Sequence, residues 1–127
     1  MPLAVVHSRD LKPKKLTMFE EGDIYCDVPL YGEKGFLPIS GGVYTMSEGT
    51  LDIEYGWDEI GFVTAGTMEI EHVGTGKTYT CSTGDLIFAS KGEHVIIRCE
   101  STATCIFVSY PTWDEATKDT PMENFFE

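Results

Sequence analysis

Basic residues are scarce in this chain, and long apolar runs are absent from it. The 127 residues carry 9 Lys and Arg against 21 Asp and Glu, a formal net charge of -12. A charge of this sign repels nucleic acid and anionic lipid, so we expect neither nucleic acid nor a membrane as a partner. No stretch approaches the roughly 20 apolar residues of a membrane-spanning helix, and the N-terminus turns polar too soon for a signal peptide. The sequence therefore predicts a cytoplasmic protein.

Cysteines are few and lack a metal-binding spacing. None of Cys26, Cys81, Cys99 and Cys105 belongs to a Cys-x-x-Cys pair, which disfavours zinc and thioredoxin-like sites. Free cysteines usually behave as small buried apolar side chains, and we expect that here. A tight turn at residues 101–103 would set Cys99 opposite Cys105. This arrangement would give either a redox-active or metal-binding thiol pair, or two neighbouring core thiols.

The chain contains many short apolar segments, and glycine-bearing turns separate them. Apolar runs cover residues 62–73, 78–81 and 86–89, and glycine-bearing turns at 74–77 and 83–85 separate them. A hydrophobic content of 42% over this length suits one domain with a real core. Short strands joined by glycine turns at this spacing predict an all-β barrel or sandwich.

The alternation of apolar and acidic residues at 51–55 predicts a half-buried strand with Leu51, Ile53 and Tyr55 on its inner face. Residues 31–40 contain glycines and a proline and are predicted to be a loop. Further strands are predicted at 24–28 (ended by Pro29), 42–46, 95–99 and 104–110. The predicted domains are an N-terminal arm at 1–23 that pairs with a sheet edge of this chain or of a second subunit, a barrel at 24–113, and an acidic C-terminal tail at 114–127.

Residues 49–110 resemble a cupin. The first cupin motif ends with a glutamate followed seven residues later by a glycine, and Glu59 and Gly66 keep that spacing. The second motif is kept in outline by Gly84-Asp85 and Ser90-Lys91-Gly92. The resemblance implies a single-domain jelly-roll barrel, also described as a double-stranded β-helix. It also implies a homodimer, because exposed barrel edges invite pairing.

The chain is more closely similar to the small cupins of the ethanolamine-utilization Q (EutQ-like) type. The matching segments are Trp57-Asp58-Glu59, residues 62–66, residues 83–87, Lys91-Gly92 and the closing Tyr110-Pro111-Thr112-Trp113. This resemblance covers about half of the chain closely and residues 24–113 loosely. It implies a context of ethanolamine utilization and bacterial microcompartments.

Cupin enzymes generally hold one divalent metal with two or three histidines and a glutamate, so the resemblance allows a test of each ligand position. With the glutamate at Glu59, the paired histidine positions hold Ile53 and Tyr55, or Asp52 and Glu54 if the loop is one residue longer, and the remaining histidine position holds Val95. His94 stands one residue away and is expected to face outward. We therefore expect a degenerate metal site without a tightly bound metal, with Glu59 and His94 as the weak remaining ligand candidates.

Glu59 is the first candidate for catalysis, and Tyr55 is the second. A carboxylate that points into an apolar barrel has a raised pKa and suits acid–base chemistry, and a phenol beside it completes a proton-transfer pair. The alternative is a carboxylate at the barrel rim that binds backbone N–H groups or a lysine. Apolar and aromatic side chains predicted to bind a ligand, or else to form core, are Tyr44, Met46, Trp57, Val95 and Phe107, with Tyr110 as a further candidate. His72 is expected to pack inside the barrel.

Three functional hypotheses remain at this point. The first is an enzyme that uses Glu59 and Tyr55 without histidine ligands. The second is a module that binds a small molecule without turnover, which the missing histidines favour over a metalloenzyme. The third is an assembly or accessory protein with a vestigial pocket. Relatives of the EutQ type are associated with acetate kinase activity, but the chain lacks a phosphate-binding glycine-rich loop.

Overall fold

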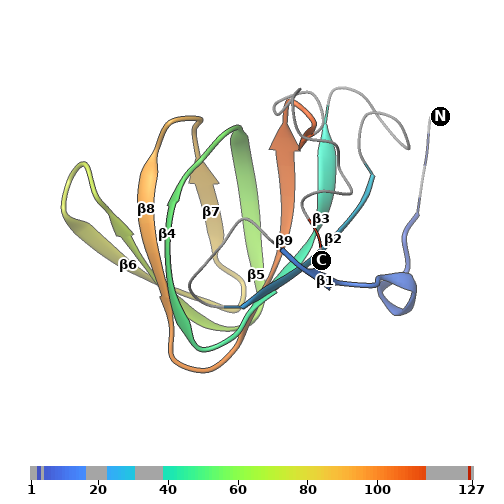
Figure 1. Cartoon of the computed structure of the whole chain (residues 1–127), viewed down its shortest axis with the longest axis horizontal. Helices are drawn as coiled ribbons and strands as arrows, with labels where there is room; N and C mark the ends of the chain where they lie inside the picture. The colour runs from blue at the N-terminus through green and yellow to red at the C-terminus, as the bar shows by residue number, and fades with distance from the viewer. Residues whose placement is uncertain (1–2, 4, 17–22, 31–38, 114–125, 127) are drawn as a thin grey trace.

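The computed structural model describes residues 3, 5–16, 23–30, 39–113 and 126, and these residues form an almost entirely β structure (Figure 1). A short 3-10 helix at Ser8–Asp10 precedes the strands. The strands are β1 (Lys14–Lys15), β2 (Ile24–Leu30), β3 (Ser40–Met46), β4 (Gly49–Glu54), β5 (Asp58–His72), β6 (Lys77–Ser82), β7 (Leu86–Ala89), β8 (His94–Cys99) and β9 (Ala103–Tyr110). The predicted all-β class is confirmed.

The strands form one continuous antiparallel sheet that curls into two facing halves, joined by the long strand β5. The first half, sheet I, has the strand order β1-β2-β3-β9-β5-β7. The second half, sheet II, has the order β6-β5-β8-β4. Buried apolar side chains from both halves meet between them and make the core, as in a jelly-roll barrel.

Strand β5 changes sheets at a β-bulge. Its pairing with β9 shifts register between Val63 and Ala65, and the following Gly66 has a φ of 78°. A Cβ atom at Gly66 would lie 2.0 Å from the carbonyl oxygen of Thr102, so only glycine fits at this crossing. The extra residue inverts the alternation, because Val63 faces the core before the bulge and Met68 faces it afterwards.

The predicted alternation in 51–55 is confirmed in β4 and the residue after it. Leu51 and Tyr55 are buried, whereas Asp52 and Glu54 are exposed. The turns predicted at 74–77 and 83–85 connect β5 to β6 and β6 to β7. Local turn chemistry and period-2 patterning therefore predicted the strands of this region correctly.

The N-terminal part of the sheet differs from the prediction in two ways. Pro29 does not end its strand, because β2 continues to Leu30 with a register shift after Asp27. A proline is accommodated at such an irregular edge position, since its missing N–H breaks no regular ladder. The arm does reach a sheet edge, where β1 pairs with β2 of the same chain. Residues 31–38 of the predicted loop lie outside the described residues, and Ser40 at its end already belongs to β3.

The predicted juxtaposition of Cys99 and Cys105 is wrong. β8 pairs with β4 and β5, whereas β9 pairs with β3 and β5, so the connection between them crosses from sheet II to sheet I. Cys99 consequently lies opposite Gly49, and Cys105 lies opposite Tyr44. All four cysteines are buried free thiols, as predicted. Among the described residues, no helix is long and apolar enough to cross a membrane.

The outer faces of the two sheets have opposite chemistry. Sheet II carries ion pairs on its outer face, from Arg98 to Glu69 and Glu71. The outer face of sheet I carries exposed apolar side chains that are neighbours across strands β7, β5 and β9. We call this set the apolar face: Ile60, Phe62, Leu86, Phe88, Ile106, Val108 and Tyr110.

Candidate functional site

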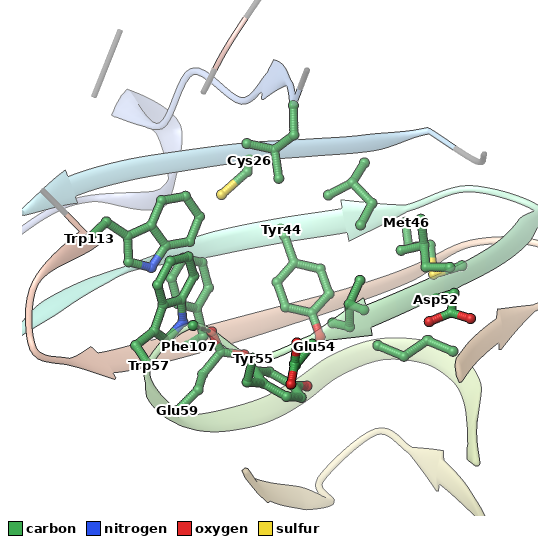
Figure 2. A pocket seen from close by; sticks show the side chains of 16 residues that line it. Cys26, Tyr44, Met46, Asp52, Glu54, Tyr55, Trp57, Glu59, Phe107 and Trp113 are labelled. Carbon is green, nitrogen blue, oxygen red and sulfur yellow. Dashed lines mark hydrogen bonds between the residues drawn. The ribbon is translucent and has the colours of Figure 1, made fainter. Parts of the chain in front are cut away.

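A cavity of about 370 Å³ lies between the two sheets and is the candidate site (Figure 2). Its walls come from β2, β3, β4, β5, β8 and β9 and from the segments that follow β4 and β9. Figure 2 shows Trp57, Phe107 and Trp113 gathered at one end of the cavity, with Met46 and Asp52 at the other end. The volume is at the small end of the range for ligand sites.

Glu59 holds a defined position in this cavity through two hydrogen bonds. The residue lies on the inner face of β5, two positions before the buried Gly61. The indole Nε1 of Trp57 donates to Oε1 of Glu59 at 3.0 Å, and the Ser109 hydroxyl donates to the same oxygen at 3.4 Å. The indole Nε1 of Trp113 in turn donates to Ser109 Oγ at 3.1 Å. Three side chains therefore orient one carboxylate.

Burial raises the pKa of Glu59 from 4.5 to about 7, even though the hydrogen bonds from Trp57 and Ser109 lower it. The cause is the loss of water around the charged form, which two neutral donors do not replace. The carboxyl group is consequently present in both protonation states near neutral pH. It can accept or release a proton there, or carry a negative charge, depending on what binds beside it.

The aromatic end of the cavity is a packed wall of rings. Trp57 and Trp113 stack with ring centroids 4.6 Å apart, and Phe107 stacks on Trp113 at 5.5 Å. Tyr44 continues the wall at 5.9 Å from Phe107. Aromatic rings at these separations interact favourably beyond their burial, so the wall presents a fixed surface to anything that enters the cavity.

Tyr55 is buried and lines the cavity beside Glu59. Burial is the main cause that raises the pKa of Tyr55, and the nearby charge of Glu59 raises it further. Burial likewise raises the pKa of Tyr44 well above its ordinary value. Both phenols therefore stay protonated near neutral pH and are available as hydrogen-bond donors.

The structure brings most of the predicted site residues together. Glu59, Tyr55 and four of the five predicted ligand contacts line the cavity: Tyr44, Met46, Trp57 and Phe107. The prediction of a proton-transfer pair stays a prediction, because the groups that hydrogen bond to Glu59 are Trp57 and Ser109.

Four other residues named in the sequence analysis lie elsewhere. Val95 lines a second cavity of about 350 Å³, whereas Ile97, two residues further along the same face of β8, lines the first. His94 lies on the outer face, as expected, and pairs there with Asp52. Tyr110, the further ligand candidate, is exposed as part of the apolar face. His72 lines the second cavity, where its Nε2 lies 2.6 Å from Glu93 Oε2.

Sequence reasoning missed Ser109 and Trp113 as parts of the site. Ser109 is fully buried at the end of β9, with no local pattern to mark it as polar core. Trp113 belongs to the closing Tyr-Pro-x-x-Trp motif, which was the signal available for it. The backbone N–H of Trp113 donates to Ser40 Oγ at 3.3 Å, and this bond ties the end of the barrel to the start of β3.

The residues of the cavity do not fit the metal centre of a cupin enzyme. No histidine stands at the paired positions, whether these are Ile53 and Tyr55 or Asp52 and Glu54. Glu59 lines the cavity, whereas His94 pairs with Asp52 on the outer face. Within the ranges that the structure describes, no group of three or more His, Cys, Asp or Glu side chains could hold a metal ion. We therefore derive no chemistry through a metal at this site.

Comparisons with known proteins agree with this fold. Acetate kinase EutQ of Clostridioides difficile (strain 630) is 36% identical over 70 residues, which cover 55% of this chain and 43% of that protein. The match thus spans less than half of the relative's length. The structure of the Clostridium difficile EutQ protein is 30% identical, with a TM-score of 0.64 over 71% of this chain and 69% of that one.

An RmlC-like cupin from Shewanella frigidimarina NCIMB 400 has a TM-score of 0.69 at 11% identity, over 89% of this chain and 95% of that one. At this identity the likeness shows the cupin fold alone. The model of the family described as ethanolamine utilisation protein EutQ matches residues 9–115. That match covers most of the chain, and the chain therefore belongs to the EutQ family of cupins.

Proposed function

We propose that this cupin binds a small molecule in the cavity between its sheets, with Glu59 as the polar anchor. One observation carries the proposal. Both donors to Glu59 reach Oε1, and no described residue hydrogen bonds to Oε2. Oε2 is accessible from the cavity, because Thr112 Oγ1 is the one fully buried side-chain oxygen without a partner among the described residues, and Oε2 needs a hydrogen-bond donor from water or from a ligand. A ligand donor would meet this need, and the aromatic wall would enclose the ligand's apolar part.

The intrinsic tryptophan fluorescence of the chain can report ligand binding in this cavity. Its sequence contains 2 tryptophans, and both Trp57 and Trp113 line the cavity. A screen of small molecules by intrinsic fluorescence should therefore reveal ligands that enter the site. Glu59→Gln should weaken such a ligand by roughly 10-fold or more, the usual effect of removing a hydrogen bond to a charged group. His94→Gln, on the outer face, is the matched control. Equal affinity of the wild type and Glu59→Gln would place the ligand elsewhere.

A second candidate function, proton transfer to or from a bound substrate, is favoured by the pKa of Glu59. A group with a pKa of about 7 is well matched to acid–base catalysis at neutral pH. The protonated phenol of Tyr55 would supply a second donor. For any substrate found by turnover, the pH–rate profile should contain an ionisation near pH 7 that Glu59→Gln removes, and Tyr55→Phe should lower kcat. A profile unchanged in Glu59→Gln would refute this role.

The name of the Clostridioides difficile relative raises acetate kinase activity as a further possibility, but the cavity gives it no support. Phosphoryl transfer depends on cationic groups around the phosphates. The described residues that line the cavity include no Lys or Arg. We expect purified protein to produce no acetyl phosphate from acetate and ATP, measured by hydroxamate formation.

We also propose that the chain forms a homodimer through its apolar face. The seven side chains of this face include no charge, whereas the outer face of sheet II carries ion pairs. Two copies with a net charge of -12 each repel one another, and a contact between faces without charged side chains adds no close like-charge pair to that repulsion. A set of cross-strand neighbours on one face suits an isologous contact, in which the same face serves both copies. The burial of these apolar side chains would supply the attraction that offsets the repulsion, and a second copy that presents the same face is the proposed occupant.

Sedimentation velocity at micromolar concentration tests this proposal. Phe62 lies opposite Leu86 and Ile106 in the apolar face, so Phe62→Glu should convert the dimer to a monomer that still unfolds cooperatively. Thr80→Glu adds the same charge to an exposed position of β6 and should stay dimeric. A wild-type monomer, or a dimer that Phe62→Glu leaves intact, would contradict the proposed interface.

A further inference from the structure

We propose that the ligand of the central cavity is a small organic cation, such as a quaternary ammonium compound or a protonated amine. This inference rests on the binding function proposed above and names the chemical class of the ligand. It follows from the charges that line the cavity, from the aromatic wall, and from the cavity's size.

The charged groups that line the cavity all have the same sign. Its described lining includes Asp52, Glu54 and Glu59 and no Lys, Arg or His. Asp52 and Glu54 lie on the exposed face of β4, where Asp52 pairs with His94, so Glu59 is the carboxylate that faces the cavity. An anionic ligand would meet Glu59 without a compensating charge. A cation would be attracted both by Glu59 and by the net charge of the whole chain.

The aromatic side chains of the cavity favour binding of a cationic ligand over a neutral one. Five aromatic side chains line the cavity: Tyr44, Tyr55, Trp57, Phe107 and Trp113. Aromatic faces attract ammonium groups through the ring quadrupole, and Trp and Tyr do so most strongly. A neutral apolar ligand could fill the same space, but it would leave Oε2 of Glu59 without a partner. An organic cation satisfies both the carboxylate and the rings.

The cavity also limits the size of the ligand. At about 370 Å³ it is at the lower end of ligand-site volumes, so an ammonium head with a short apolar or hydroxylated body fits best. Weakly hydrated alkylammonium groups also lose less hydration on entry than compact inorganic ions do, which suits an apolar wall.

Glu59 should make the affinity for a cation depend on pH. The titratable groups that neighbour Glu59 or line the cavity are Cys26, Tyr44, Asp52, Glu54, Tyr55 and Cys105. Burial is the main cause that raises the pKa of the two buried thiols and both phenols, so these four groups stay neutral near pH 7. Asp52 and Glu54 are exposed to solvent. The charge of Glu59 therefore changes near pH 7, and cation affinity should fall as the pH drops below that value.

The test compares choline with its neutral isostere, 3,3-dimethylbutan-1-ol, on the full chain at low ionic strength. Binding is followed by the fluorescence of Trp57 and Trp113 and by calorimetry. We expect choline to bind at least about 10-fold more tightly than the isostere at pH 8, and to lose up to about 10-fold per pH unit below pH 7. Glu59→Gln should remove both the preference and the pH dependence. Glu93→Gln, in the second cavity, should retain both.

The outcomes separate the ligand class from the binding function itself. If the isostere binds as tightly as choline and Glu59→Gln weakens it, the cavity is a ligand site but the cationic class is wrong. If choline, tetramethylammonium and benzyltrimethylammonium all fail to bind at about 10 mM, the cationic class is also overturned. If no compound in the wider screen perturbs either tryptophan, the proposed binding function fails as well.

Discussion

The stability of the fold should depend on the charge of Glu59. In the folded state the pKa of Glu59 is about 7, whereas the ordinary value of 4.5 applies to the unfolded chain. Between pH 4.5 and 7 the folded state therefore binds the proton more tightly, and the free energy of unfolding falls as the pH rises through this window. A difference of this size corresponds to about 3 kcal/mol above pH 7, where the folded protein must bury the charge.

Replacement of Glu59 by Gln removes this charge and keeps an oxygen that can accept from Trp57 and Ser109. At pH 8 we expect Glu59→Gln to be more stable than the wild type by about 1–3 kcal/mol, because its hydrogen bonds are weaker but its burial costs less. For a domain of this length the gain is roughly 4–10 °C in Tm. At pH 4 the two proteins should unfold at nearly the same temperature.

The assay is thermal or urea unfolding of both proteins from pH 4 to 8, followed by tryptophan fluorescence. Glu54→Gln is the matched control, because Glu54 is an exposed carboxylate of the same cavity, and its pH dependence should parallel that of the wild type. Parallel curves for the wild type and Glu59→Gln would refute the argument, since they would mean that Glu59 titrates alike in both states. If Glu59→Gln is more stable but binds the ligand less well, then Glu59 contributes to ligand binding and lowers the stability of the fold.

Three further predictions concern the fold. Gly66→Ala should destabilise the protein by roughly 2–4 kcal/mol, since its Cβ would meet Thr102 at positive φ; Gly76→Ala, also at positive φ but in open space, should cost only about 1 kcal/mol in urea unfolding. The four buried thiols should react with Ellman's reagent far more slowly in native protein than in urea; rapid native reaction would contradict their burial. His94→Ala should change stability by less than about 1 kcal/mol, because its pair with Asp52 is exposed; a larger loss would assign that pair a structural role.

The strands of this fold could be predicted from the sequence where short-range patterns determine them. Glycine turns and alternation placed the segments from Leu51 to Ala89 correctly. The error at Cys99 and Cys105 has a different origin. A short connection between two strands favours a hairpin, but this connection crosses between sheets, and only the long-range pairing of β8 with β4 decides that. Pro29 was misread for a related reason, because the end of β2 is irregular and tolerates a missing N–H.

The candidate site was predictable in its main residues and not in its hydrogen bonds. The spacing from Glu59 to Gly66 identified the carboxylate, and alternation turned Tyr55 inward. The bonds from Ser109 and Trp113 arise from β9 packing beside β5, about fifty residues away in sequence. Val95 was assigned to the wrong cavity because a motif position does not reveal how far each cavity extends along a strand, and Ile97 on the same face of β8 lines the first cavity instead.

The bulge in β5 has a consequence for comparison of this chain with its relatives. Inward positions before the bulge have odd numbers, as at Glu59 and Val63, and those after it have even numbers, as at Met68 and Ile70. Deletion of one residue between Val63 and Gly66 would turn Glu69 and Glu71 into the core. Insertions and deletions within the EutQ family should therefore be confined to the exposed turns. In an alignment of β5, apolar residues are expected at the odd positions before the bulge and at the even positions after it.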